Sequence, residues 1–507
     1  MITIVTYIPM LYKAVTFCKK NAFNLLKFVQ ADKQVWKILG NNLRGAKCSS
    51  YSKTMIANKR KNFKAARWLP ADRKVINDWC GKRLNKLKVK RKEQFDKMNE
   101  YFPHYEKADE EISHMQNVDR KILLTNLQLH PSVAELLLAI KNDPAIYMSY
   151  HNMYTQQADH APEGGIYVKT WQEGILLIND CVNSAPEYDS DVLIPVPMNA
   201  ILNLPMATSS GHQLFLNDKV NVLFKNILNE WGQYLMSKYS TDVLVDSATE
   251  PGGWFSSEAL VAMPDFENTY ICAPDEPFYG YTSFDDFFVR KLKEGARPVE
   301  DADDQSVIVS ACEAAPLKIA YDVKEYDSFW IKEQNYSMEF ILNRNPLATA
   351  FYGGTVYQGF LSPTTYHRFH SPVDGYIYDI EMVEGTYFSQ PYFKDENLLF
   401  NEAQQYMCHI CTRAIYWIKA DNPDIGLMAF IALGISDVST VEATVKKGDR
   451  VKKGQETGMF HFGGSSHLLV FRKGVNVVFD DDVVPGMSAA NIEVNARIAK
   501  VSAPTKK

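Results

Sequence analysis

The sequence lacks the features that mark several common classes of protein. Its eight cysteines are scattered over 507 residues without a preceding secretory signal, so we expect free thiols in a reducing compartment. A net charge of −5 predicts neither general binding to nucleic acid nor an acidic tail. No long internal repeat and no low-complexity tract is present. With 46% hydrophobic residues, a chain of this length can bury a large core, and two domains are expected.

Clustered metal ligands are also missing from the sequence. Cys408 and Cys411 form a single CxxC pair, whereas a structural zinc ion needs four ligands and no second pair lies nearby. His367 and His370 are three positions apart, and no third ligand is clustered with them. We therefore predict no bound metal and interpret the cysteine pair as two buried residues, with zinc binding or redox chemistry as the alternative.

The first 60 residues form an unusual leader. Residues 1–12 are mostly apolar but too few to span a bilayer as a simple helix, and the basic stretch that follows contains Asp32 as its only acid. A secretory signal would carry its positive charge before the apolar core. Such a leader is typical of mitochondrial targeting or of a membrane-surface segment, and a poorly ordered extension is the alternative. We expect a cytoplasmic protein, with a mitochondrial location as the alternative.

The remaining chain predicts an α+β protein. Residues 61–215 have the pattern of a mainly helical N-terminal domain, and apolar residues recur at helical spacing over residues 218–238. From about residue 249, Gly and Pro interrupt short runs rich in Val, Ile, Tyr and Phe, which predicts strands and turns. Residues 376–383 alternate after an Asp-Gly turn signal. The predicted domains are a leader (1–60), a helical domain (61–215) and a β-rich catalytic domain (216–507).

One short motif suggests chemistry. Gly463-Gly464-Ser465-Ser466 lies between two strand-like runs, although such a motif alone is often just a turn. A serine hydroxyl attacks the carbonyl of the preceding residue only where the backbone bends sharply, and glycine at position 464 permits this at low steric cost. The attack also needs a base, for which His367 and His370 are candidates.

Three ordered motifs together resemble the phosphatidylserine decarboxylase family. They are residues 280–298 (GYTSFDDFFVR and GARP), residues 366–375 (YHRFHSPVDG) and residues 462–466 (FGGSS). Further segments resemble a subgroup with an extra N-terminal domain, which includes the L-tryptophan decarboxylase of psilocybin biosynthesis. These segments are 253–255, 310–313, 354–360 and 459–466. The resemblance covers the chain from about residue 65 to the C-terminus and omits the leader.

The resemblance implies a precursor that cuts its own Gly464–Ser465 bond. Ser465 would attack the Gly464 carbonyl to form an ester, and elimination followed by hydrolysis would leave a pyruvoyl group as the covalent cofactor. The products would be a β chain (1–464) and an α chain (465–507). The pyruvoyl carbonyl would react with the substrate amine and accept the electrons released when CO2 leaves.

The resemblance also assigns roles to individual residues. His370 matches the base of self-cleavage, and His367 matches the histidine associated with decarboxylation, as proton donor or substrate positioner. Glu313 stands where the family has an aspartate; it is one methylene longer, and an ordinary strand-end carboxylate is the alternative. Arg290 and Arg297 are candidates for binding a substrate carboxylate or phosphate, or for structural ion pairs.

Two substrates fit the resemblance. The first is a free L-amino acid, aromatic such as tryptophan, and the second is phosphatidylserine, converted to phosphatidylethanolamine in phospholipid biosynthesis. The basic stretch 82–92 is interpreted as a solvated helical face, with peripheral contact to an anionic membrane as the alternative. Expected partners are the substrate and the cleaved chains themselves, not nucleic acid, and a homo-oligomer is compatible with the sequence. A non-enzymatic relative is disfavoured because Ser465, His370 and His367 are all retained.

Overall fold

The computed structural model describes most of the chain that follows the leader in sequence. The described residues are 67–103, 118–161, 167–189, 192–247, 252–327, 335–391, 403–437, 439–462 and 465–502, without the side chain of Ser465. The chain divides into two units, Met1–Lys59 and Arg60–Lys507, and every contact given below lies within the second. The predicted leader lies outside the described residues, and the predicted domain boundary at 215/216 stays a prediction.

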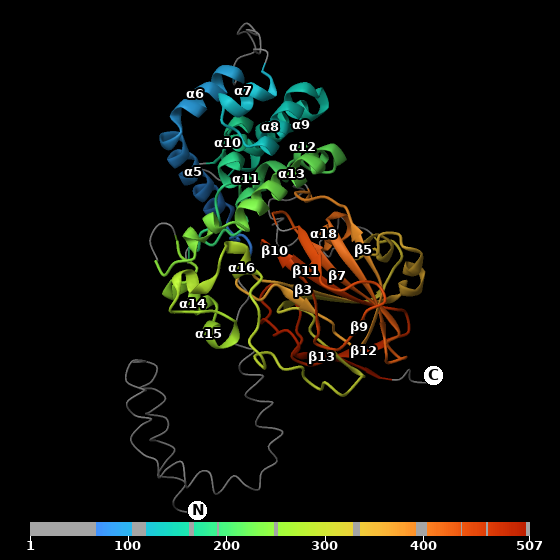
Figure 1. The fold of residues 1–507 in the computed structure, drawn as a ribbon. Helices are drawn as coiled ribbons and strands as arrows, with labels where there is room; N and C mark the ends of the chain where they lie inside the picture. Colours follow the sequence, from blue (N-terminus) through green and yellow to red (C-terminus); the bar gives the residue numbers. More distant parts are fainter. Residues whose placement is uncertain are drawn as a thin grey trace, which may run out of the picture. The chain divides into compact units, whose positions relative to one another are not determined.

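The N-terminal part of the second unit is helical, and its helices gather in one region (Figure 1). They are α5 (Arg73–Lys90), α6 (Lys92–Tyr101), α7 (Arg120–Thr125), α8 (Pro131–Asn142), α9 (Pro144–Gln156), the 3-10 helix η2 (Gln157–His160), α10 (Trp171–Cys181), α11 (Pro197–Met206), α12 (Ser209–Phe215) and α13 (Asp218–Leu235). Local capping explains several starts: Asp143 and Asn217 accept from backbone N–H groups of α9 and α13, and Thr170 and Glu173 form a capping box on α10. The predicted helix at 218–238 is confirmed as α13.

Short helices also follow α13, where the sequence predicted strands and turns. They are η3 (Lys238–Val243), α14 (Ser257–Ala262), α15 (Phe266–Thr269), η4 (Pro277–Gly280) and α16 (Phe284–Phe288), and later α17 (Met338–Ile341), η5 (Pro346–Phe351) and α18 (Gln404–Ile410). Among the described residues the first strand begins at Val307, so the expectation of strands from about residue 249 was wrong between residues 252 and 306. Ser256 and Ser283 cap α14 and α16, and the phenylalanines of the region pack against one another as a cluster.

The C-terminal part consists of three antiparallel sheets. Their strands are β1 (Val307–Val309), β2 (Ala315–Val323), β3 (Gly354–Phe360), β4 (Arg368–His370), β5 (Gly375–Val383), β6 (Arg413–Ala420), β7 (Leu427–Gly434), β8 (Thr440–Ala443), β9 (Arg450–Val451), β10 (Glu456–His461), β11 (Ser465–Phe471), β12 (Asn476–Phe479) and β13 (Arg497–Ser502). The orders are β2-β3-β11-β7-β6-β5-β9, β4-β10-β8 and β1-β13-β12. The predicted strand at 376–383 is confirmed as β5, and the α+β class is confirmed.

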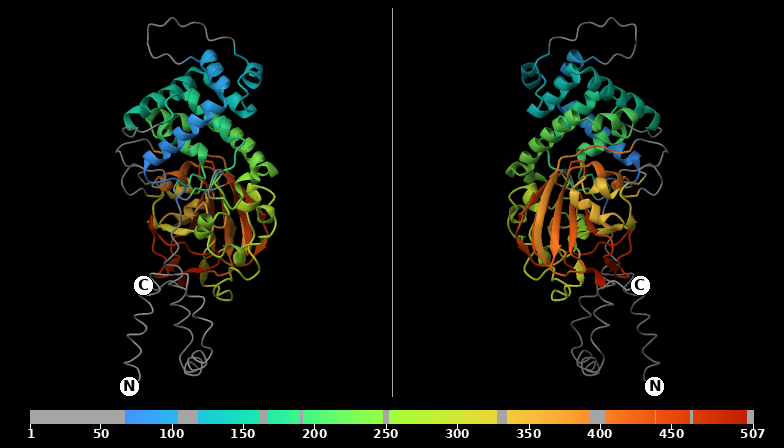
Figure 2. Two further views of the ribbon diagram at one scale, coloured as in Figure 1. Left: turned by 90° about the vertical axis from the view of Figure 1, so that its left-hand side faces the viewer. Right: turned by 90° about the vertical axis from the view of Figure 1, so that its right-hand side faces the viewer.

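Strand β11 is buried on both faces. Alternate residues Leu468 and Val470 belong to a core cluster shared with the N-terminal helices, whereas Leu469 and Phe471 belong to a second cluster shared with β4 and β10. The two opposite side views of Figure 2 show the N-terminal helices above the strands of this unit. The start of β11 is thereby placed inside the protein, between two cores.

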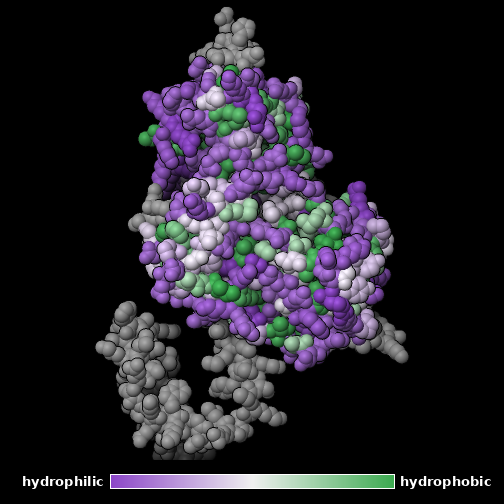
Figure 3. All heavy atoms as spheres, in the orientation of Figure 1, coloured by the Kyte–Doolittle hydropathy of each residue, from purple (hydrophilic) through white to green (hydrophobic). Residues whose placement is uncertain are grey.

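The face of the described structure that Figure 3 shows is mainly hydrophilic. In the view of Figure 3, hydrophobic residues occur in small separate groups among polar ones. Within the part of the chain that the structure describes, none of the helices combines the length and the hydropathy needed to cross a bilayer.

Candidate active site

The predicted cleavage position lies where the chain passes from one sheet to another. Strand β10 of a three-stranded sheet ends at His461, and β11 of the seven-stranded sheet begins at Ser465. Phe462 follows β10 with a left-handed backbone angle, φ 70°. The predicted strand-like runs on both sides of the motif are confirmed, while Gly463, Gly464 and the Ser465 side chain lie outside the described residues.

The backbone after the cleavage position belongs to the seven-stranded sheet. Ser465 pairs with Gly434 of β7, and Ser466 lies between Leu433 and Phe360 of the two neighbouring strands. The buried Ser466 hydroxyl accepts a hydrogen bond from Gln358 Nε2 at 2.8 Å and donates one to the Gly359 carbonyl at 2.9 Å. Its hydrogen-bonding capacity is therefore committed to fixing β11 against β3.

Both predicted histidines lie beside the strand that leads into the cleavage segment. In the pairing of β4 with β10, Glu456 is opposite His370 and Met459 is opposite Arg368. The backbone N–H of Phe460 also donates to the His367 carbonyl at 2.9 Å. This pairing explains how residues distant in sequence from Ser465 are brought to its approach strand.

His370 has both ring nitrogens engaged. Its Nδ1 is 2.8 Å from the Gly454 carbonyl, and its Nε2 is 3.0 Å from the Tyr366 hydroxyl. A carbonyl only accepts, so Nδ1 carries the proton and Nε2 accepts from the tyrosine. Burial lowers the pKa of His370, and burial raises the pKa of Tyr366. The histidine is therefore neutral near pH 7, with Nε2 as its basic nitrogen.

His367 differs because neither ring nitrogen makes a hydrogen bond of good geometry among the described residues, although the Thr365 backbone interacts with the ring and opposes the lowering of its pKa. The ring is fully buried, stacks on Phe288 with 4.0 Å between centroids, and meets the edge of Trp68 at 6.1 Å. Burial, followed by the charge of Arg290, places its pKa well below the usual value. A buried imidazole without hydrogen bonds is costly, and it distinguishes His367 from His370, although His467 in the core of β11 shares this property.

Glu313 pairs with an arginine rather than with a histidine. Arg297 Nε donates to Glu313 Oε2 at 3.0 Å, and Arg297 Nη2 donates to Oε1 at 3.1 Å. The negative charge of Glu313 contributes to the raised pKa of Tyr366, whose hydroxyl contacts His370. Glu313 therefore acts on His370 only indirectly, through its charge on Tyr366. Its predicted catalytic role stays a prediction.

The two candidate anion-binding arginines also contact protein groups. The buried Arg290 donates from Nη2 to the carbonyls of Thr364 and Thr365 at 2.8 and 2.7 Å, and its guanidinium lies 4.4 Å from the centre of the Tyr270 ring. Arg297 is bound by Glu313. In the described structure, contacts with protein groups therefore account for the positions of both guanidinium groups, which agrees with a structural role for the two arginines.

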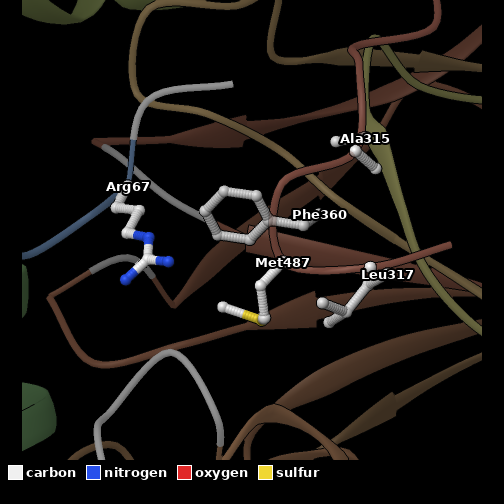
Figure 4. A pocket seen from close by; sticks show the side chains of 7 residues that line it. Arg67, Ala315, Leu317, Phe360 and Met487 are labelled. Atoms are coloured by element: carbon white, nitrogen blue, oxygen red, sulfur yellow. The ribbon is translucent and has the colours of Figure 1, made fainter. Parts of the chain in front are cut away.

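A small recess lies next to the cleavage strand (Figure 4). Its cavity volume is about 10 Å³, and it is lined by Arg67, Ala315, Leu317, Phe360, Gly486, Met487 and Ala489. Phe360 is the cross-strand partner of Ser466, and Trp68 donates from Nε1 to the Leu361 carbonyl at 2.7 Å. The recess was missed from the sequence because its walls come from segments far apart in the chain.

A second feature was also missed. His461 was noticed only as part of the serine motif, yet its ring lies between the carboxylates of Asp285 and Glu442. The only sequence signal was its position just before the motif, because the two acids lie in other elements.

The cysteine pair is confirmed as two buried free thiols. Burial raises the pKa of Cys408, and it raises the pKa of Cys411 to about 11. Across the described ranges, no group of three or more His, Cys, Asp or Glu side chains is arranged to hold a metal ion.

Two family models match this chain. Both are described as phosphatidylserine decarboxylase; one matches residues 284–499, which contain the histidines and Ser465, and the other matches residues 130–263 in the helical region. The second model extends across the predicted boundary at 215/216, which stays a prediction.

Several characterised proteins are similar over most of their own length. The decarboxylase iboD of Amanita muscaria is 44% identical over 313 residues, 58% of this chain and 88% of the relative. The L-tryptophan decarboxylase of Psilocybe cubensis is 35% identical over 361 residues, 67% of this chain and 80% of the relative. A phosphatidylserine decarboxylase proenzyme of Fusobacterium nucleatum is 33% identical over 266 residues, 52% of this chain and 79% of the relative.

Proposed function

Because the chain belongs to the phosphatidylserine decarboxylase family and is a decarboxylase, we propose that it makes a pyruvoyl cofactor from its own Ser465. The Ser465 hydroxyl attacks the Gly464 carbonyl, and the amide becomes an ester. Elimination then breaks the bond between the serine Cβ and the ester oxygen, which leaves a carboxylate on Gly464. The dehydroalanine takes up water and releases ammonia, so the α chain begins with a pyruvoyl group.

His370 is the proposed base for this self-cleavage. The proton on Nδ1 is directed at the Gly454 carbonyl, so Nε2 is the nitrogen that takes up a proton. Because burial lowers its pKa, the ring is uncharged and able to accept a proton at neutral pH. The Tyr366 hydroxyl at 3.0 Å holds the ring in this tautomer and orientation.

His367 is the proposed residue of the decarboxylation step, as proton donor or substrate positioner. The observation that supports it is the pair of buried ring nitrogens without a well-formed hydrogen bond among the described residues. The pyruvoyl group supplies the electron-accepting carbonyl for the loss of CO2. Phe288 and Trp68 surround the imidazole with apolar rings and exclude water from it.

The pairing of Glu313 with Arg297 makes one prediction. Glu313→Gln removes the charge that faces Arg297 and the Tyr366–His370 pair, so we expect self-cleavage to slow by about tenfold. The measurement is the fraction of cut chain against time after synthesis. The matched control is Glu493→Gln, because Glu493 is exposed and lies 4.0 Å from the same arginine. Equal processing of both variants would remove Glu313 from the maturation machinery.

The proposed substrate is an aromatic L-amino acid such as tryptophan. It is supported by the names of the Psilocybe relatives. Phe360, Met487 and Leu317 add a small apolar surface beside the cross-strand partner of Ser466. Phosphatidylserine is the second candidate, supported by the proenzyme relatives. The decisive assay measures CO2 released from tryptophan, other amino acids and phosphatidylserine vesicles. Turnover of the vesicles alone would overturn the amino acid proposal.

The recess makes a second prediction. We propose that the substrate ring packs on the apolar surface around it. Met487→Trp covers this surface from a partly exposed position, so we expect kcat/KM for the aromatic amino acid to fall by about tenfold or more while self-cleavage proceeds normally. Val484→Trp is the matched control, because Val484 is exposed in the same loop and does not line the recess. Equal kcat/KM for the two variants would show that the substrate binds elsewhere.

A further inference from the structure

His461 is held by two carboxylates at the end of β10. Its Nδ1 is 3.0 and 3.1 Å from the two oxygens of Asp285, a residue of α16, and its Nε2 is 3.0 Å from Glu442 Oε2 in β8. Only 11% of the His461 side chain and 10% of the Asp285 side chain are exposed, whereas Glu442 is 56% exposed. The group therefore joins three elements at the point where β10 ends.

The geometry favours a positively charged histidine. Carboxylate oxygens only accept, so both ring nitrogens donate when the ring carries two protons. Burial alone would lower the pKa of His461, but the hydrogen bonds and charges of Asp285 and then Glu442 outweigh burial and raise it. The protonated His461 ring in turn supplies a positive counter-charge for the nearly buried Asp285 carboxylate.

The next residue is held as well. Phe462 packs against helix α13, with its ring 6.5 Å from that of Trp231. A Cβ atom on Gly232 would lie 2.9 Å from Phe462 Cε2, so the absent side chain of this glycine makes room for the ring. On the other side of the cleavage position, the backbone of Ser465 and Ser466 in β11 pairs with strand β7. The chain is thus fixed on both sides of residues 463–464.

We propose that Asp285, His461 and Glu442 form a charged anchor that positions the chain for self-cleavage at the Gly464–Ser465 bond. This inference rests on the proposed self-cleavage. The attacking hydroxyl must approach the preceding carbonyl closely, and a displacement of about 1 Å costs roughly a hundredfold in rate. An ion pair that pins the third residue before Gly464 limits such displacement. His461 is a positioning residue here, because it acts through the backbone.

The test is the pH dependence of self-cleavage in the full-length chain made by cell-free translation. For the wild type, we expect a bell-shaped profile: cleavage increases as pH rises through the pKa of His370 and decreases as His461 loses its proton. Asp285→Asn lowers the pKa of His461, so the alkaline decrease should shift by about one unit to lower pH. Glu442→Gln should shift it less, because this acid is half exposed.

Removal of the histidine and a matched control complete the experiment. His461→Gln should cleave about tenfold more slowly and lose the alkaline decrease. The control is His130→Gln, which removes another histidine–carboxylate pair, 3.1 Å from Glu230, in the helical region and should leave the profile unchanged. Thermal unfolding of each variant in an uncleavable Ser465→Ala background measures folding separately.

The outcomes separate the two proposals. An alkaline limb that stays at the same pH in Asp285→Asn, or wild-type cleavage in His461→Gln, would overturn the anchor while the self-cleavage proposal stands. Absence of any cleavage in the wild type would overturn the proposed function and the anchor with it. A shifted alkaline limb in Asp285→Asn, with unchanged unfolding, supports the anchor.

Discussion

Replacing Ser465 with alanine is expected to leave the chain uncut and without measurable decarboxylase activity. The variant lacks the hydroxyl that attacks the Gly464 carbonyl, and it also lacks the atoms that become the pyruvoyl group. Mass spectrometry should find one chain of full length, whereas the wild type should yield an α chain that starts at position 465 with a blocked N-terminus. An uncut wild type with full activity would contradict the proposed cofactor.

The neighbouring serine provides the matched control. Ser466→Ala loses the hydrogen bonds to Gln358 and Gly359, so the unfolding free energy should fall by about 1–3 kcal/mol. Cleavage and a blocked α chain should nevertheless be retained, because the attacking group is still present. Failure of both serine variants to mature would show that β11 needs this hydrogen bonding to fold, and it would not identify the nucleophile.

Replacing His367 with phenylalanine is expected to separate maturation from turnover. Phenylalanine keeps the shape and the stacking on Phe288, and no well-formed hydrogen bond to a described residue is lost because the ring nitrogens make none. The variant should therefore fold and cut itself. Loss of the ring nitrogens should lower kcat by about a hundredfold or more, the usual contribution of a positioned acid or base. Single-turnover CO2 release from the cleaved variant measures this effect.

The control for His367 is another buried histidine. His467 in β11 is also fully buried, and no hydrogen-bond partner for its ring nitrogens occurs in the described structure. Its ring packs against Tyr357 and Phe430 in the core, and burial lowers its pKa to about 3. His467→Phe should retain most of the activity. A loss as large as that of His367→Phe would mean that removal of any buried imidazole disturbs the protein, and the role of His367 would have to be withdrawn.

Local sequence patterns predicted the elements that depend on local interactions. Helix α13 was predicted because its apolar residues recur at helical spacing, and β5 because its residues alternate after an Asp-Gly turn. The same reasoning failed between residues 252 and 306. There the runs of aromatic residues resemble strands, but serine caps start short helices and the rings pack against each other.

The candidate site was predicted in part. The motif resemblance identified Ser465, His367, His370 and Glu313, and β4 brings both histidines beside the strand that leads to Ser465. The resemblance did not indicate that Arg297 binds Glu313 or that Tyr366 contacts His370. These contacts depend on side-chain directions, which differ between neighbouring residues of a strand and of a loop.

The amino-acid sequence alone predicted the α+β class and the decarboxylase family, and its motifs suggested the residues proposed for maturation, because periodicity and short motifs are properties of neighbouring residues. Folding determined the rest. His461 contacts Asp285, which lies 176 positions away in the chain, and Phe360 and Met487 both line the recess. No local sequence pattern predicts either arrangement. Such contacts depend on how the sheets and helices pack. They raise the pKa of His461, leave the His367 ring nitrogens without a well-formed hydrogen bond among the described residues, and form the recess beside Phe360.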